Sequence, residues 1–337
     1  MIIILLATIL LIVLFLLWSN KQSIPVSDKA LHLFWRDKVV VVTGGASGIG
    51  RDICLQLAAL GSQLVVFDVS PEALKAIENE IKQGGGRIDT LITDVADKHQ
   101  VQESMKQAHM IAGRKEGNSR AVDVVIANAG IVFAKKLLDL EHEHIQRTID
   151  VNLLSHFWIA KAALPLMKQR GMIVVPTMLT FIEGKGHLVF VSSVAALVGM
   201  SNLTDYCARF VSVWSSSDSH SKFGSFGFAE SLRRELWSEP GIHVTTVCPW
   251  AVSTGMFSGM GKVVLPMITS HHVATSVVHA VCNGDGVLYV PWFMRYAAIS
   301  HLLPEGMMDW MAYLTNAMEA GSTVVGRGVL SNMNVQT

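Results

Sequence analysis

A glycine-rich segment near the start of the chain has the residue types and spacing needed to hold a phosphate group. Residues 43–50, TGGASGIG, directly follow four valines and precede a stretch with helical character. In this order Gly44 permits a tight turn, Gly48 lets the backbone approach a pyrophosphate, and Gly50 allows close packing of helix on strand. The helix N-terminus then faces the phosphates. The segment predicts a dinucleotide-binding loop, with an ordinary flexible turn as the alternative.

An aspartate stands where such a loop needs a partner for the ribose. Asp68 ends the second apolar run, 18 residues after Gly50, and the expected interval is about 20 residues. A carboxylate here accepts hydrogen bonds from ribose hydroxyls and repels a 2′-phosphate. The residue favours NAD over NADP, and a solvated strand end is the alternative interpretation.

A regular scaffold has to position these residues. Short β-branched runs alternate with helical stretches along the sequence, which is typical of a parallel sheet with helices on both faces. Strands are predicted at residues 39–43, 63–68, 87–94, 122–127, 186–192 and 243–248. Helices are predicted at residues 49–60, 71–83, 142–167 and 223–238. Beyond Pro249 the chain reads as a loop and then an apolar tail. We expect an α/β fold, a Rossmann-type doubly wound parallel sheet in a single domain.

Composition limits the partners of this domain. The 337 residues are 50% hydrophobic, and 27 Lys and Arg balance 27 Asp and Glu. This balance predicts no nucleic-acid partner and a substrate without high charge. The four cysteines are scattered without a Cys-x-x-Cys pair. The pattern argues against any metal site and against a disulfide framework, and it favours a reducing, cytosol-facing domain.

The N-terminal region predicts a membrane anchor. Residues 2–18 are apolar except for Thr8, and as a helix they span roughly 25 Å against a bilayer core of about 30 Å. A cleaved signal peptide is the alternative, but the run lacks a basic segment before it and a small-x-small site after it. We expect an anchor at 1–20, a linker at 21–35, a catalytic domain at 36–285 and an apolar extension at 286–337 that packs in the core or on a membrane.

Further motifs make the sequence resemble the short-chain dehydrogenase/reductase superfamily. They are Asp94-Val95, Asn128-Ala129-Gly130, Asn152, and Ser193 placed 13 residues before Tyr206. Segments 186–189, 205–208, 221–224, 246–249 and 254–257 more closely resemble the subfamily of epidermal retinol dehydrogenase 2, retinol dehydrogenase 10 and 17β-hydroxysteroid dehydrogenases 11 and 13. The resemblance covers about residues 36–315.

The resemblance implies roles in cofactor binding for further residues, beside the preference for NAD that Asp68 indicates. In the family the position of Asp94 contacts adenine, the Asn-Ala-Gly turn supports the sheet beside the cofactor, and the position of Thr254 contacts the nicotinamide carboxamide. A plain loop threonine is the alternative for Thr254. The expected cofactor-binding residues are Gly44, Ser47, Gly48, Ile49, Gly50, Asp68, Asp94, Val95, Asn128, Ala129, Gly130, Tyr206, Lys222, Pro249 and Thr254.

The resemblance also implies four catalytic residues. Tyr206 is the acid/base, Lys222 lowers its pKa and holds the nicotinamide ribose, Ser193 polarises the substrate oxygen, and Asn152 holds a water that links Lys222 to solvent. A phenol of pKa about 10 is a poor base near neutral pH unless an ammonium lies nearby. Ser192 competes with Ser193, but strand alternation turns it to the other face.

Two segments depart from the family pattern. The family has Tyr-x-x-x-Lys, one helical turn apart, but here Lys222 follows Tyr206 by 16 residues. Omission of residues 209–220 restores the spacing, and residues 171–183 are extra in another connection. We expect both to be retained introns or gene-model errors. If residues 209–220 belong to the protein, Lys222 returns through a loop and catalysis is weakened.

The sequence therefore predicts an NAD-dependent oxidoreductase acting on the CH–OH group of a lipophilic alcohol or on the matching ketone, such as a retinoid, steroid or long-chain alcohol. The anchor and the resemblance imply a place at the endoplasmic reticulum membrane or on lipid droplets, with the catalytic domain in the cytosol. A homodimer is expected by resemblance. The alternative is an impaired pseudoenzyme that acts as a membrane or lipid-droplet scaffold.

Overall fold

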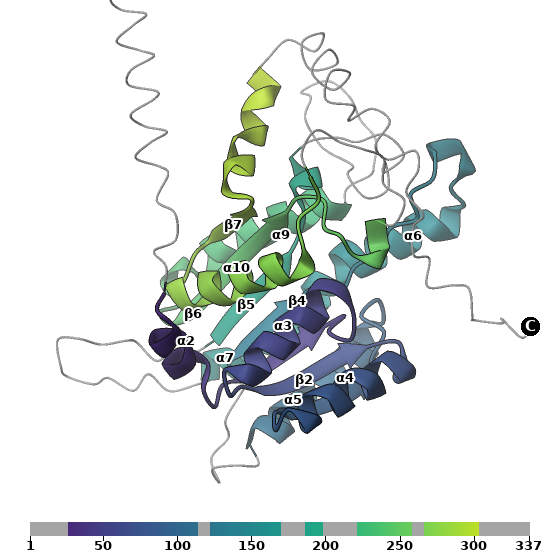
Figure 1. Cartoon of the computed structure of the whole chain (residues 1–337). Helices are drawn as coiled ribbons and strands as arrows, with labels where there is room; N and C mark the ends of the chain where they lie inside the picture. The colour runs from purple at the N-terminus through teal and green to yellow at the C-terminus, as the bar shows by residue number, and fades with distance from the viewer. Residues whose placement is uncertain (1–25, 114–121, 170–185, 198–220, 258–265, 303–337) are drawn as a thin grey trace, which may run out of the picture.

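The computed structural model describes residues 26–113, 122–169, 186–197, 221–257 and 266–302. These residues contain one parallel sheet of seven strands in the order β3-β2-β1-β4-β5-β6-β7 (Figure 1). The strands are β1 (Val39–Thr43), β2 (Gln63–Asp68), β3 (Arg87–Ile92), β4 (Val124–Ala127), β5 (Gly186–Val191), β6 (Ile242–Pro249) and β7 (Val287–Val290). The order reverses between β1 and β4, and ligands bind at such a reversal in open α/β sheets.

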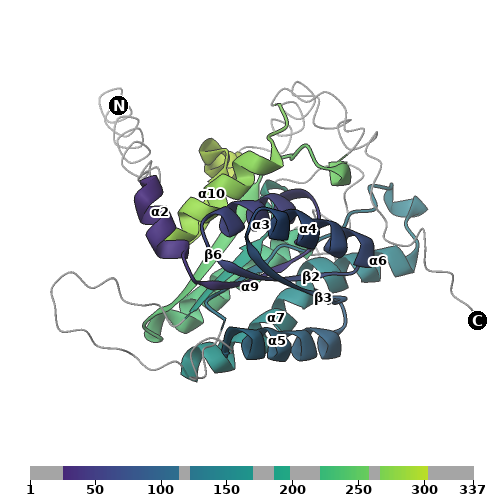
Figure 2. The same cartoon turned by 60° about the horizontal axis from the view of Figure 1, so that its bottom comes forward.

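Helices cover both faces of this sheet. They are α2 (Asp28–Trp35), α3 (Gly48–Ala59), α4 (Pro71–Gln83), α5 (Lys98–Gly113), α6 (His142–Ile149), α7 (Ser155–Gln169), α9 (Ser221–Glu235) and α10 (Ser270–Asn283). Short turns are η1 (Leu137–Asp139), the π-helical η2 (Asp150–Leu154), η3 (Val194–Ala196), η4 (Leu236–Ser238), η5 (Gly255–Phe257) and η6 (Trp292–Leu302). Figure 2 shows α5 and α7 on one side of the sheet and α3, α4 and α10 on the other.

The valines of β1 explain how one strand serves two layers. Val39 and Val41 pack in a core with α5, α7 and α9, whereas Val40 and Val42 pack in a second core with α2, α3, α4 and α10. All four side chains are buried. A continuous run of β-branched residues suits a central strand that is covered on both faces.

The predicted single-domain α/β class and the six predicted strands are confirmed, with strand ends that differ by up to two residues. The segment directly after Pro249 is irregular, as expected, but the prediction missed α10 and β7, which follow it. Burial of Val273, Ala274, Val277, Val278 and Val281 on one face fixes α10 as a helix, although valine is a weak helix former. Strand β7 pairs in parallel with β6, so the sheet continues beyond the expected domain end at 285.

The expected helix at 142–167 is present but contains an irregularity. It consists of α6, the π-helical turn η2 and α7, so one wider turn interrupts the α-helical hydrogen-bond pattern. Such turns are rare and occur frequently at functional sites. Asn152, one of the expected catalytic residues, lies in this turn.

Some expectations concern parts of the chain outside the described residues. These are the anchor at 1–20, the segments 171–183 and 209–220, Tyr206 and most of the extension at 286–337. Within the described ranges, none of the helices has the length and apolar character needed to cross a bilayer.

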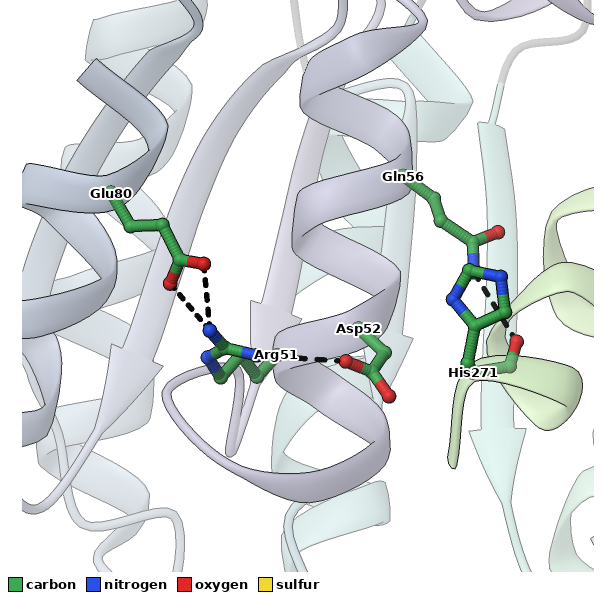
Figure 3. Close-up of polar contacts among 5 residues, drawn as sticks. All are labelled: Arg51, Asp52, Gln56, Glu80 and His271. Atoms are coloured by element: carbon green, nitrogen blue, oxygen red, sulfur yellow. Dashed lines mark hydrogen bonds and ion pairs between the residues drawn. The ribbon is translucent and has the colours of Figure 1, made fainter. Parts of the chain in front are cut away.

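Polar contacts hold α3, the helix that follows the glycine-rich loop, to helices on both sides (Figure 3). Arg51 donates to both carboxylate oxygens of Glu80 in α4, at 2.6 and 2.7 Å, and lies 3.7 Å from Asp52. Gln56 Nε2 donates to the backbone oxygen of His271 in α10 at 3.2 Å. Exposed contacts of this kind add little stability each, but together they fix the direction in which the N-terminus of α3 points.

Candidate cofactor and active site

A cavity of about 270 Å³ lies at the carboxyl ends of the central strands. Most of the residues predicted from the sequence line it, namely Gly44, Ser47, Gly48, Ile49, Asp68, Asp94, Val95, Asn128, Ala129, Gly130, Ser193, Lys222, Pro249 and Thr254. Gly50 and Asn152 are buried against residues of this lining, and Tyr206 lies outside the described residues. The structure thus brings together motifs that are far apart in the sequence.

The glycine-rich loop fits tightly around the ends of β1 and β4. Gly44 has φ +60°, and a Cβ there would lie 2.9 Å from Ala129 Cα. A Cβ on Gly50 would overlap the backbone oxygen of Gly44 and lie 2.6 Å from Asn128 Nδ2. Gly48 has φ +54° and faces the methyl group of Thr254. Residues with side chains would therefore disturb the backbone of the loop at these positions.

The turn after β4 is bound to the glycine-rich loop. Asn128 Nδ2 donates to the backbone oxygens of Thr43 and Gly44, at 3.1 Å each. The Thr43 hydroxyl accepts from the backbone N–H groups of Asn128 and Ala129, also at 3.1 Å. These four bonds fix the mouth of the cavity at the point where the strand order reverses.

Carboxylates lie at one end of the cavity. Asp68 accepts hydrogen bonds from the backbone of Ala46, in the glycine-rich loop, and of Ser70, at 3.2 Å each. Asp94 forms an ion pair with Arg147 of α6 at 2.8 Å, and Arg147 also lines the cavity. The sequence analysis missed Arg147, because a helical arginine belongs to no local motif and its contact spans 53 residues of sequence.

Two consecutive serines follow β5 and have different partners. Ser192 Oγ donates to the backbone oxygen of Lys222 at 2.8 Å. Ser193 Oγ accepts from Ala195 N at 3.1 Å and lies 3.5 Å from the backbone oxygen of Pro249. Both residues line the cavity, and Ser192 directs its hydroxyl to the backbone of α9. The choice of Ser193 over Ser192 as the group that polarises the substrate stays a prediction. Ser193 keeps extended backbone geometry, with φ −165° and ψ 157°, so strand alternation is consistent with the different partners of the two hydroxyls.

Lys222 reaches the cavity despite its distance from Tyr206 in the sequence. Its side chain is buried, and Nζ donates to the backbone oxygen of Val191 at 3.2 Å. Burial lowers the pKa of Lys222 to about 8, because a low-dielectric surrounding disfavours the charged form. A Cβ on Gly130 would lie 3.4 Å from this Nζ and 3.2 Å from Asn152 Oδ1. The ammonium and the amide therefore flank the same glycine.

Asn152 is committed to the backbone. Its Oδ1 accepts from Ile131 N and its Nδ2 donates to Ile131 O, both at 2.9 Å. The side chain thus fixes the segment that follows β4. Whether Asn152 also holds a water beside Lys222 stays a prediction.

An apolar wall closes the cavity near Ser193. Trp250, Val252 and Met256 contribute to the lining. Trp250 packs against a small cluster that contains Val194, Cys248 and Met294. The sequence analysis missed Trp250, although a large apolar residue directly after Pro249 was a visible signal.

Comparisons with known proteins agree with this geometry. Residues 38–263 match the short chain dehydrogenase family. Human epidermal retinol dehydrogenase 2 is 34% identical over 288 residues, which cover 82% of this chain and 83% of that protein. Bovine short-chain dehydrogenase/reductase family 16C member 6 is 32% identical, with coverages of 82% and 79%, and human 17-beta-hydroxysteroid dehydrogenase 13 is 27% identical, with 88% and 90%.

A solved structure supports the fold. The crystal structure of levodione reductase superimposes with a TM-score of 0.59 at 22% identity and covers 76% of this chain and 96% of that chain. The comparisons agree with the arrangement of the glycine-rich loop, Ser193 and Lys222 around one cavity. The chain belongs to the short-chain dehydrogenase family of oxidoreductases acting on CH–OH groups, in the subfamily of epidermal retinol dehydrogenase 2 and 17β-hydroxysteroid dehydrogenases 11 and 13.

Proposed function

We propose that the protein is an NAD-dependent dehydrogenase that oxidises a lipophilic alcohol or reduces the corresponding ketone. The observation that carries the proposal is the arrangement of one cavity. One side holds the glycine-rich loop and Asp68, and the other holds Ser193 and Lys222. This is the arrangement that hydride transfer between a dinucleotide and an alcohol requires.

The cavity fits a nicotinamide dinucleotide. Gly48 faces the cavity without a side chain, so the backbone at the N-terminus of α3 is open to a pyrophosphate. Asp68 would accept hydrogen bonds from the adenosine ribose and would repel a 2′-phosphate. Arg147, the nearest cation on the same lining, is already paired with Asp94. These features favour NAD over NADP.

The proposed chemistry needs three groups besides the cofactor, whose nicotinamide ring, when bound, exchanges a hydride with the substrate carbon. Tyr206, assigned from its motif, takes the alcohol proton or returns it. Lys222 is largely protonated below pH 8, and an ammonium beside a phenol lowers the pKa of the phenol. Ser193 accepts a hydrogen bond from Ala195 N and donates a long one, of 3.5 Å, to the backbone oxygen of Pro249. We infer that a substrate oxygen would replace Pro249 as the acceptor of this proton.

An apolar substrate fits the other end of the cavity. Trp250, Val252 and Met256 contribute mostly apolar surface to this part of the lining. The relatives include proteins named for retinol and for 17-beta-hydroxysteroids. We infer that the substrate is a retinoid, steroid or long-chain alcohol that reaches the site from a membrane.

The proposal includes a membrane location. An anchor at residues 1–20 would hold the catalytic domain on the cytosolic side of the endoplasmic reticulum or on a lipid droplet, where lipophilic alcohols accumulate. Flotation of the full chain with liposomes, and its loss when residues 1–20 are removed, tests this part. A homodimer is also proposed, and light scattering of the detergent-solubilised chain tests it.

The scaffold alternative has lost its main support. It depended on a Lys222 displaced by residues 209–220, but Lys222 lines the cavity. No described feature favours the scaffold over the enzyme.

Turnover by membranes that contain the full chain tests the proposed function. We expect oxidation of all-trans-retinol or a steroid alcohol with NAD, weaker oxidation with NADP, and no turnover by Lys222→Ala. A matched chain without residues 209–220 shows whether that segment affects the rate. Absence of turnover with every lipophilic alcohol, together with normal NADH binding, would contradict the proposal.

A further inference from the structure

Lys222 lies on α9, one residue from the start of the described range 221–257. Its position in the site depends on contacts between this part of α9 and its neighbours.

Two of these contacts are already evident. The Ser192 hydroxyl holds the backbone oxygen of Lys222 at 2.8 Å. Gly224 packs against the π-helical turn, where a Cβ would lie 2.9 Å from Leu153 Cδ2. The absence of a side chain at Gly224 lets α9 approach η2 closely, which brings Lys222 near Asn152.

A third contact joins the same two helical segments one turn further on. His156 Nδ1 and Ser225 Oγ lie 2.9 Å apart. His156 follows Asn152 by four residues and Ser225 follows Lys222 by three, so each is one helical turn beyond a proposed catalytic residue. Both side chains are buried, with exposures of 1% and 0%.

The histidine is neutral and has few alternatives. Burial, with the Lys222 charge as the smaller cause, lowers the pKa of His156 to about 3. Its other ring nitrogen, Nε2, is buried and finds no hydrogen-bond partner in the described part of the chain. Ser225 is thus the polar group that orients the ring, and loss of the serine hydroxyl leaves a buried histidine with neither nitrogen satisfied.

We propose that His156 and Ser225 form a positioning pair that holds Lys222 against Asn152 in the active site. The proposal rests on the proposed function, because the pair matters for turnover only if Lys222 acts in catalysis. Neither residue contacts the cavity, so the pair acts through the placement of α9 on η2 and α7.

The chain contains a matched control. His187 Nε2 and Thr245 Oγ1 lie 2.8 Å apart between β5 and β6, and both are buried. Burial lowers the pKa of His187 to about 3 as well. This pair lies away from the carboxyl ends of the strands, so Thr245→Val removes a buried hydroxyl bound to a histidine without affecting the site. It also removes the hydrogen bond from Thr245 Oγ1 to the backbone oxygen of Asp285, so it costs at least as much stability as Ser225→Ala.

The test compares Ser225→Ala, Ser225→Thr and Thr245→Val in the full chain. One readout is the rate at which acetic anhydride acetylates Lys222 in the folded protein, followed by mass spectrometry. The other is retinol oxidation with NAD. For Ser225→Ala we expect labelling of Lys222 to rise about threefold or more as the packing of α9 on η2 and α7 loosens, and kcat to fall about tenfold with KM within about twofold.

Ser225→Thr keeps a hydroxyl, so we expect its Lys222 labelling and its kcat to match those of the wild type. We expect Thr245→Val to change neither quantity, although both Ser225→Ala and Thr245→Val lower the melting temperature. If Ser225→Ala folds poorly, Ser225→Cys replaces it, because a thiol has similar volume and a weaker hydrogen bond. Wild-type labelling in Ser225→Ala, or equal increases in Ser225→Ala and Thr245→Val, would overturn the proposal. If labelling responds to Ser225→Ala alone but no chain turns over substrate, the positioning pair stands and the proposed function fails.

Discussion

The two halves of the cavity are held in different ways. On the side of β1, β2 and β4, hydrogen bonds run mostly between one side chain and backbone atoms of the next loop, as for Asn128 with Thr43 and Gly44. On the side of β5 and β6, the site depends on side chains from helices that meet far along the sequence, as for Ser225 and His156. Changes in the first half should damage fold and cofactor binding together, whereas changes in the second should reduce turnover more than cofactor binding.

The largest expected effect is on the catalytic side. Lys222→Met removes the ammonium that would lower the pKa of the acid/base, so we expect kcat to fall by about 10²–10⁴-fold. Removal of a buried charge should leave the melting temperature unchanged or higher. Steady-state kinetics and calorimetry measure the two quantities. If Lys222→Met lowers kcat less than tenfold, or clearly lowers the melting temperature, the two halves of the cavity do not differ as described.

The cofactor side should respond in the opposite manner. Gly50→Ala places a methyl group against the backbone oxygen of Gly44, so the loop must shift. We expect the Kd for NADH to rise about a hundredfold and stability to fall by about 1–3 kcal/mol.

Gly227→Ala is the control for that change. Gly227 lies in α9, and a Cβ there meets nothing within 4 Å. An alanine in a helix interior should stabilise the protein by about 0.5–1 kcal/mol. NADH fluorescence and thermal unfolding of both variants check the prediction, and equal Kd values for the two would contradict it.

A smaller effect should appear in cofactor choice. Asp68→Asn removes the carboxylate that would repel a 2′-phosphate. Ala46 N and Ser70 N bond to different oxygens of Asp68, so the single amide oxygen of asparagine keeps only one of these two hydrogen bonds. We expect the NADP to NAD ratio of kcat/KM to rise about tenfold or more. Rates with each cofactor at saturating retinol measure this ratio. An unchanged ratio would mean that another residue sets the preference.

The smallest expected effect is a slope of stability with pH. The pKa of Lys222 is about 8 in the folded chain and 10.5 ordinarily, so between these values the unfolded chain binds more protons. Stability should therefore rise from pH 8 to 10.5, by at most about 1.4 kcal/mol per pH unit from this group. Urea unfolding of wild type and Lys222→Met measures the difference. Parallel slopes for the two chains would show that the folded pKa is not lowered.

The same division explains what the sequence could and could not predict. The loop from Gly44 to Gly50 and the strand end at Asp68 carry their meaning in local spacing, and the structure places them as expected. Arg147 and the His156–Ser225 pair were missed, because each matters only through a partner that lies more than 50 residues away. The spacing of residues within a single helix cannot predict a contact with a segment that lies far away in the sequence.

Element boundaries show the limit of local signals as well. Helix α10 and strand β7 were hidden in an apolar, valine-rich region where helical and extended patterns look alike. Their identity depends on the surfaces available to them. Strand β7 is a short run that becomes a strand because β6 offers it a free edge.

The π-helical turn at Asp150–Leu154 has a consequence for the tolerance of this chain to changes in length. Each residue added to a helix rotates the following part by about 100°, and a π turn contains one residue more than an α turn. The turn thus sets the rotational phase between Arg147, which points to Asp94, and His156, which points to Ser225. Deletion of a single residue there would turn one of the two away from its partner. We therefore expect the segment from α6 to α7 to have the same length in related proteins.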